Sequence, residues 1–296
     1  MRAVRLTRSL ALLFAGATAV LLSASAVDAG DASEAVGLQS LVAEGSLVAF
    51  PERNLGYFIT ASGGVRQSRD GGRTWRRVGS VAPSIAVDFV SETDGFALAR
   101  RGALWTTTDG GRTWQAGHRF SPAPGELEGP APPLVVDFVD RQFGFVASGP
   151  RRIFRTRDGG RSWERLRFAC PRHDYLGGLA FANRREGFAV CGGQAATAMQ
   201  RRAYSFTADG GTSWRSGRRH VASGHVALVA SPSARIRYVY ASRLGISRLG
   251  GPLLLFTDDV DSVLAMTWPS PRIGYALLFH GGLRRTVDGG RQWRRP

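Results

Sequence analysis

The chain has 296 residues, and its 39 basic residues, all of them arginine, outnumber 23 acidic ones, which gives a formal net charge of +16. This charge bears on solubility and on the choice of partners, but not on the fold. Only two residues are cysteine, which excludes more than one intramolecular disulfide.

The first element in chain order is a secretory signal peptide, predicted over residues 1–29. Three arginines precede an apolar stretch at residues 10–22, and small residues then allow cleavage after Ala26 or Ala29. The stretch is too short for a membrane span, and no later stretch reaches the roughly 20 apolar residues that a span needs. We therefore expect a secreted or periplasmic protein without a membrane span. Removing the signal takes away three arginines and one aspartate, so 36 basic and 22 acidic residues remain, a net charge of +14.

Five Asp-Gly-Gly hairpins, each ending in a tryptophan, recur along the rest of the chain. Their Asp and Trp residues are Asp70 and Trp75, Asp109 and Trp114, Asp158 and Trp163, Asp209 and Trp214, and Asp288 and Trp293. A Gly-aromatic pair lies upstream of each hairpin, and a second bulky residue stands six positions before that glycine. Self-similarity at a period of a few tens of residues is typical of a repeat architecture.

The hairpin residues have structural roles that need no ligand. Asp can accept hydrogen bonds from the amides of its own turn, and the two glycines supply positive φ angles. The tryptophan can bury a large apolar area between neighbouring repeats. We therefore interpret these residues as structural staples and not as functional ones.

A sixth, degenerate unit is predicted between the fourth and fifth hairpins. The distance from Asp209 to Asp288 is 79 residues, about twice the 39 residues that separate the first two hairpins. In this interval Leu249 replaces the Asp and Leu254 replaces the Trp, and Ile236 falls in the aromatic position.

Each unit contains four short stretches of period-two alternation, which indicate strands. In the second unit they cover residues 86–90, 95–100, 103–108 and 112–117. Six four-stranded antiparallel units predict an all-β fold, a six-bladed β-propeller with the Asp-Gly-Gly hairpins at the third-to-fourth strand turns. We place this single domain at residues 46–296. Residues 30–45 form an N-terminal segment, in which residues 38–42 are a candidate strand for closing the last blade.

At these hairpins the chain resembles the Asp-box, or bacterial neuraminidase repeat (BNR), superfamily. The longer unit, in which Asp88-Phe89 precedes Gly95-Phe96, is most similar to the photosystem II assembly and stability factor group and more distantly to sialidases. The resemblance implies a propeller, but Asp boxes occur in glycoside hydrolases, sorting receptors and assembly factors alike. Two departures limit the functional implication. The assembly factors resemble seven-bladed rings, whereas this chain has six units. The Arg-Ile-Pro motif that precedes the first Asp box of sialidases is missing from residues 30–70.

The predicted topology places second-to-third strand turns and blade connections on the face opposite the Asp boxes. Two insertions fall on this face, at residues 118–134 and 192–202. Cys170 and Cys191 fall there too, and in an exported protein we expect them to form a disulfide worth about 3 kcal/mol. Two free thiols are the alternative.

Paired arginines also gather on this predicted face, with a histidine and a tyrosine nearby. Their planar guanidinium groups suit an acidic protein surface or an anionic glycan. The candidate ligand-binding residues are Arg100, Arg101, Arg151, Arg152, Arg201, Arg202, His173 and Tyr175. The alternative is that these residues are solvated turn charges in an arginine-rich chain.

Catalytic chemistry has weak support in the sequence. Glu126, Asp174 and Tyr175 are the candidate catalytic residues, since glycoside hydrolysis uses a pair of carboxylates. The histidines lack metal-ligand spacing, and nucleotide-binding motifs are missing, so we expect no metal, no cofactor and no nucleic-acid partner. The sequence favours a non-enzymatic, exported binding or assembly scaffold that recognises a protein or an anionic glycan opposite its Asp boxes. A glycoside hydrolase of sialidase-like architecture is the alternative.

Overall fold

The computed structural model describes most of the predicted propeller domain. The described residues are 42–43, 45–99, 101–120, 135–148, 152–168, 170, 174–192, 199–223, 226–242, 244–255, 262–280 and 282–296. The predicted signal peptide, most of the candidate closing strand and four candidate site residues lie outside this set. Those four residues are Arg100, Glu126, Arg151 and His173.

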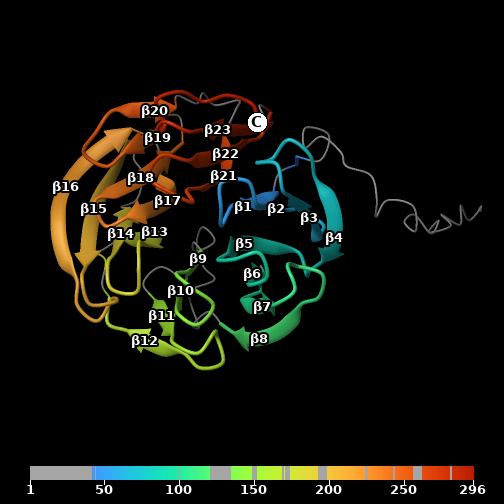
Figure 1. The fold of residues 1–296 in the computed structure, drawn as a ribbon. Coiled ribbons are helices and arrows are strands. Elements are labelled where there is room, and N and C mark those ends of the chain that lie inside the picture. The colour runs from blue at the N-terminus through green and yellow to red at the C-terminus, as the bar shows by residue number, and fades with distance from the viewer. Residues whose placement is uncertain are drawn as a thin grey trace, which may run out of the picture.

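Six antiparallel sheets surround a central axis as the blades of a propeller (Figure 1). Blade 1 contains β1 (Leu47–Ala49), β2 (Gly56–Ile59), β3 (Gly64–Ser68) and β4 (Arg76–Ser80). Blade 2 contains β5 (Ser84–Phe89), β6 (Gly95–Ala99), β7 (Ala103–Thr107) and β8 (Gln115–Arg119). Blade 3 contains β9 (Val135–Phe138), β10 (Gly144–Ala147), β11 (Ile153–Thr156) and β12 (Glu164–Leu166).

Blade 4 contains β13 (Tyr175–Phe181), β14 (Gly187–Gly192), β15 (Met199–Thr207) and β16 (Arg215–Ser223). Blade 5 contains β17 (Val226–Ser233), β18 (Ile236–Ala241), β19 (Gly245–Arg248) and β20 (Leu253–Leu255). Blade 6 has three strands, β21 (Val263–Thr267), β22 (Gly274–Leu278) and β23 (Gly282–Thr286), and a single bridge between Arg285 and Arg294 marks its outer edge. The predicted six-bladed, all-β propeller is therefore confirmed. In the described part of the chain, no helix has the length and apolar character to cross a bilayer.

Each Asp box folds around its own carboxylate. In blade 3, Asp158 Oδ1 accepts hydrogen bonds from Thr156 Oγ1 at 2.8 Å and from Ser162 N at 2.9 Å. The bonds from the Ser162 hydroxyl and amide lower the pKa of Asp158 to about 2. Gly159 and Gly160 adopt φ angles of 74° and 90°, which closes the turn without a Cβ clash.

Aromatic stacking joins neighbouring blades, and it explains the regular spacing of aromatics in the sequence. At five of the six seams, the aromatic residue of the second strand stacks on a ring at or just after the end of the next blade's first strand, with ring centroids 3.4–3.6 Å apart. These pairs are Tyr57–Phe89, Phe96–Phe138, Phe145–Phe181, Tyr238–Trp268 and Tyr275–Phe50. The glycine before each aromatic is needed because the bulky ring of its own blade lies over it: a Cβ on Gly56 would stand 2.4 Å from the Phe50 ring.

The predicted alignment of blade 5 is wrong by two residues. Tyr238, not Ile236, takes the aromatic position, because it stacks on Trp268 and pairs with Arg248 as Tyr275 pairs with Arg285. Leu249 packs against the blade 4 cluster that contains Phe188 and Tyr204, as a box tryptophan would. Leu254, which was expected in that role, packs instead beside Trp268 of blade 6.

Two other predicted boundaries also differ. The fourth strand of blade 2 covers Gln115–Arg119, not residues 112–117, because the amides of Arg112 and Thr113 are bound to Asp109 in the box turn. The predicted 192–202 insertion partly extends the sheet of blade 4. Arg201 and Arg202 lie within β15, which pairs with β16 as far as Met199 and Ser223.

Candidate functional site

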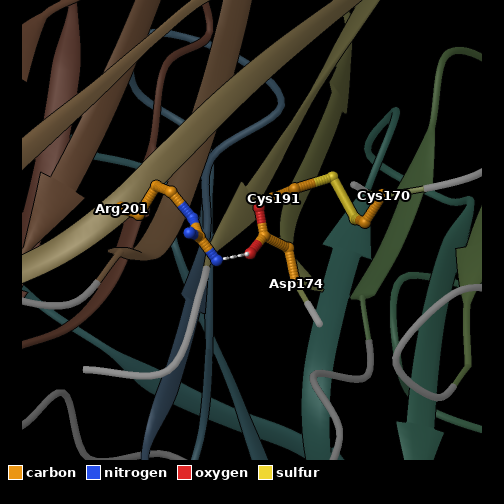
Figure 2. The surroundings of a disulfide bond; sticks show 4 residues. All are labelled: Cys170, Asp174, Cys191 and Arg201. Atoms are coloured by element: carbon orange, nitrogen blue, oxygen red, sulfur yellow. Dashed lines mark hydrogen bonds and ion pairs between the residues drawn. A yellow bond between two sulfur atoms is a disulfide. The ribbon is translucent and has the colours of Figure 1, made fainter. Parts of the chain in front are cut away.

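The face opposite the Asp boxes, which we name the disulfide face, is formed by second-to-third strand turns and blade connections. There Cys170, just before β13, is bonded to Cys191 in β14, with the two Cα atoms 5.6 Å apart (Figure 2). The disulfide expected from the sequence is present in the structure. It ties the connection between blades 3 and 4 to the second strand of blade 4.

An ion pair lies beside the disulfide. Arg201 Nη2 is 3.0 Å from Asp174 Oδ1, and the arginine side chain is 54% exposed whereas the aspartate is 1% exposed (Figure 2). Next to this pair, Gln200 Nε2 donates a hydrogen bond of 2.8 Å to the Tyr175 hydroxyl. Asp174 and Tyr175 therefore link the start of β13 to β15 across β14. The third catalytic candidate, Glu126, lies outside the described residues.

The described candidate arginines do not converge on one point. Arg202 is 4% exposed and interacts with the Tyr204 hydroxyl, so it belongs to the interior of blade 4. Arg152 is half-buried, and its Nε donates to the Ser148 carbonyl oxygen at 3.2 Å. Arg101 is exposed. Alternation along β15 explains the difference between Arg201 and Arg202, since successive side chains of a strand point to opposite sides.

A pocket of about 550 Å³ opens on the disulfide face between blades 1 and 2. We name it the Trp105 pocket after the indole from β7 that lines it. The Trp105 Nε1 atom is buried and has no hydrogen-bond partner among the described residues. The apolar wall includes Leu47, Ala61, Ala82, Ile85, Ala99 and Leu264.

Two exposed arginines complete the Trp105 pocket. Arg101 and Arg119 both line it, and Arg119 Nη1 lies 3.5 Å from the Arg101 carbonyl oxygen as a weak donor. An apolar interior beside two guanidinium groups and an unpartnered indole donor can hold an apolar side chain next to an acidic group. Of these residues, only Arg101 was a sequence candidate. Trp105 is a signal in the sequence that could have indicated this pocket. Six of the seven tryptophans occupy repeat positions, and Trp105 does not.

The central channel is lined by acidic groups and not by the candidate arginines. It encloses about 330 Å³ between the first strands of the blades, and its described lining includes Asp88 and Asp137 but no basic residue. Asp88 Oδ2 accepts a hydrogen bond from Phe138 N at 2.6 Å, and Asp137 Oδ2 accepts one from Phe181 N at 2.7 Å. Each carboxylate thus fastens its blade to the next one.

Burial dominates the protonation of both channel carboxyls. It raises the pKa of Asp88 to about 7 against the opposing hydrogen bonds. Burial and the charge of Asp88 raise the pKa of Asp137 well above its usual value. Within the described residues, no group of three or more His, Cys, Asp or Glu side chains is arranged to hold a metal ion.

Comparison with known proteins agrees with this architecture. Residues 78–171 match the family model of the photosynthesis system II assembly factor YCF48. The solved structure of YCF48 bound to D1 peptide is 20% identical, with a TM-score of 0.55 over 88% of this chain and 83% of that one. YCF48 from Cyanidioschyzon merolae is 15% identical, with a TM-score of 0.49 over 86% and 85% of the two chains.

The N-terminal domain of Nup159 is 13% identical, with a TM-score of 0.46 over 80% of this chain and 74% of that domain. At such identities the solved structures bear on the fold alone. No curated protein matches the sequence. The boxes and stacked aromatics of the whole ring identify the chain as a BNR-repeat β-propeller, and blades 2 and 3 are the part that matches the YCF48 family model.

Proposed function

We propose that this protein is an exported, non-enzymatic scaffold that binds a segment of a partner protein on its disulfide face. The observation that carries the proposal is the Trp105 pocket, with its aliphatic wall, its unpartnered indole donor and its two exposed arginines. Aromatic and arginine side chains at the centre of an interface contribute most of the binding energy in protein complexes.

The chemistry of the pocket defines the partner segment. The aliphatic wall favours an apolar side chain, and the Trp105 indole adds an aromatic surface against which it can pack. Arg101 and Arg119 favour an acidic residue next to that side chain. An anionic glycan would use the arginines but would leave the aliphatic wall without a partner, so a protein segment fits better.

The relationship to YCF48 supports the same kind of function. One solved structure of that protein contains a peptide, which is an example of peptide recognition by a propeller of this fold. The identity of the partner is not carried over. The lining of the pocket favours a partner segment in which an apolar side chain stands next to an acidic one.

Peptide binding tests the proposal. The probe is a fluorescent ten-residue peptide with one leucine between two aspartates in a Gly-Ser background. The control peptide has lysine in place of each aspartate. Fluorescence anisotropy should show binding of the acidic peptide alone, weakening as salt rises. Charge reversal at Arg101 or at Arg119, each made singly, should weaken binding by about tenfold or more.

Two further variants locate the binding site. Ala61→Trp places a large side chain at an exposed position on the pocket and should also block the acidic peptide. Arg161→Glu, an equal charge reversal in the blade 3 Asp box, is the matched control and should bind as the wild type does. Equal losses in the pocket and control variants would contradict the proposal, and so would selective capture of a sulfated glycan with no peptide binding.

We further propose that the protein is exported through its N-terminal signal. The basic and apolar N-terminus and the Cys170–Cys191 disulfide support this, because disulfides persist in oxidising compartments. Mass spectrometry of the mature N-terminus should show cleavage after Ala26 or Ala29. An intact N-terminus on protein recovered from the cytoplasm would count against export.

A further inference from the structure

The ring closes where blade 6 meets blade 1, and four arginines gather there on the Asp-box side. They surround a pocket of about 270 Å³, which we name the arginine pocket. Arg73 comes from the Asp box of blade 1, Arg285 from β23, and Arg294 and Arg295 from the C-terminal residues. Figure 1 shows the C-terminus beside β23, next to blade 1.

Blade 6 places like charges opposite each other at a position where the other box-bearing blades do not. Arg285 pairs with Arg294, and their backbone amides and carbonyls bond at 2.7 and 2.9 Å. The corresponding pairs are Gln67–Arg76, Thr106–Gln115, Arg155–Glu164 and Phe206–Arg215. Like charges directly opposite on two strands destabilise a sheet unless a counter-charge lies between them.

The side chain of Arg285 is fixed, and one edge of its guanidinium is unused. The group lies over the Tyr275 ring, 5.7 Å from the centroid. Its Nε and Nη2 atoms are buried and have no hydrogen-bond partner among the described residues. These two nitrogens form the edge of a guanidinium that binds two oxygens of one anion side by side.

Blade 3 shows what this edge does when an anion is present. Arg155, at the same register position, donates from Nη2 to Glu164 Oε2 at 2.7 Å. The Nε atom of Arg155 is also without a partner, so the difference between the two blades is the contact at Nη2. In blade 6 the position of that glutamate is taken by Arg294.

The one acidic side chain that lines the arginine pocket is already engaged. Asp288 Oδ1 accepts from Thr286 Oγ1 at 2.8 Å and from Gln292 N at 3.0 Å within its own Asp box. Gln292 Oε1 in turn accepts from Arg294 Nη2 at 2.8 Å and holds that arginine at the pocket. These bonds leave the charge of Asp288 in place, so the four guanidinium groups face one aspartate and the terminal carboxylate of Pro296, and positive charge remains in excess in the pocket.

We propose that the arginine pocket binds a tetrahedral oxyanion, phosphate or sulfate, either free or as a group on a larger polyanion. Such an ion offers several oxygens to the guanidinium groups that line the pocket, and it carries more charge than one carboxylate. A small shift of the Arg285 guanidinium would bring its buried Nε and Nη2 atoms to the ion. It would join blade 6 to blade 1 across the seam. The site lies on the side opposite the Trp105 pocket, so it is independent of the proposed peptide binding.

Thermal unfolding in millimolar phosphate or sulfate, with chloride at matched ionic strength as reference, tests the site. Phosphate at about ten times its Kd should stabilise the fold by about 1.4 kcal/mol, which raises the Tm by about 3–6 °C, and the response should saturate. Isothermal titration calorimetry with inorganic phosphate should give one site per chain. Heparin added at equal sulfate concentration distinguishes the two sources, because tighter binding of heparin assigns the site to a polyanion and equal binding assigns it to the free ion.

Two substitutions introduce residues that other blades carry at the same register positions, so both should preserve the fold. Arg294→Glu recreates the Arg155–Glu164 pair, and it should raise the Tm without phosphate and abolish the response to phosphate. Arg285→Gln copies Gln67 of blade 1 and should also abolish the response. Arg215→Glu, at the register position of Arg294 but opposite Phe206 in blade 4, is the matched control and should respond as the wild type does. An unsaturable response, or one retained by Arg294→Glu and Arg285→Gln, would overturn the proposal.

Discussion

Aspartate serves two opposite purposes in this ring, and the environment of each carboxylate decides which. In the Asp boxes the carboxylates accept several hydrogen bonds near solvent, and the bonds from Ser213 lower the pKa of Asp209 to about 2, as at Asp158. In the channel, burial raises the pKa of Asp88 to about 7. The charged form is therefore stabilised in the boxes and disfavoured in the channel.

The channel aspartates predict a loss of stability at neutral pH. The folded-state pKa of Asp88 lies above its ordinary value of 3.8, so the folded protein holds this proton more tightly than the unfolded chain does. Its contribution is complete below about pH 4 and is lost as the pH rises through about 7. Asp137 acts in the same direction. Asp88→Asn keeps an acceptor for Phe138 N and carries no charge.

Urea unfolding between pH 4 and 8 measures this effect. The wild type should lose on the order of 2 kcal/mol over this range, less than full burial would give because Asp88 borders the channel. Asp88→Asn should lose clearly less and be the more stable protein at pH 8. The box carboxylates act in the opposite sense below about pH 5, and they do so equally in wild type and variant, so the difference between the two slopes reports Asp88. A parallel slope in wild type and variant would show that Asp88 is charged at no cost.

At the scale of elements, blade 4 is the most elaborated part of the ring. Its strands β15 and β16 each have nine residues, and the hairpin they form is anchored by the Arg201–Asp174 ion pair and the Gln200–Tyr175 hydrogen bond. The disulfide lies directly beside these contacts (Figure 2). A covalent link and two polar contacts thus fix the base of the longest hairpin on the disulfide face.

Reduction of the Cys170–Cys191 bond should therefore destabilise the whole domain measurably. The bond joins residues 21 positions apart, and closing a loop of this length in the unfolded chain is worth about 3 kcal/mol. Urea unfolding with and without reductant should show this difference, and the Tm should fall by about 6–12 °C. The double variant with serine at both cysteines should match the reduced protein and ignore reductant. Equal stability of the oxidised and reduced forms would contradict this expectation.

The repeat spacing made most elements predictable, and its failures have local physical causes. Box residues such as Asp158 and Trp163 mark a register, so the strands around them could be placed from the sequence. Blade 5 has neither the Asp nor the Trp of a box. Its aromatic position is Tyr238 and not Ile236, because Tyr238 stacks on Trp268, a contact that exists only in the assembled ring. The burial of Arg202 could not be predicted from the repeat, because the insertion at residues 192–202 has no counterpart in the other blades. Only the pairing with β16 shows that β15 already includes Arg202.

The candidate site was less predictable than the fold. The sequence placed Arg101 on the correct face, but the Trp105 pocket is made by turns from blades 1 and 2 with Leu264 from blade 6. Such a surface exists only when distant segments are brought together. The sequence shows Asp88 and Asp137 directly before the bulky aromatics of two units. It does not show that they line the channel, because the channel forms only when the ring closes.

At the scale of the whole molecule, the seam between blades 6 and 1 uses the same contacts as the other seams but has fewer strands. Phe50 stacks on Tyr275 with centroids 3.5 Å apart, and Trp75 is fully buried against Leu283 of blade 6. The Tyr275 hydroxyl donates to the Arg53 carbonyl oxygen across the seam. These contacts close the ring even though β23 has only the Arg285–Arg294 bridge at its outer edge.

The N-terminal segment is expected to add to this closure. Val42 packs against the seam cluster that contains Phe50 and Tyr275, and the Ser46 amide bonds to the Ala43 carbonyl oxygen at 3.0 Å. Deleting residues 30–44 from the mature protein should lower the Tm by about 2–4 °C, because the apolar contact of Val42 is worth about 1 kcal/mol. Deleting residues 30–41 keeps Val42 and removes the rest of the candidate strand at residues 38–42. If that strand pairs with the last blade, the shorter deletion should already lower the Tm. An unchanged Tm in the shorter deletion would limit the contribution to Val42, and an unchanged Tm in both would show that the aromatic seam closes the ring alone.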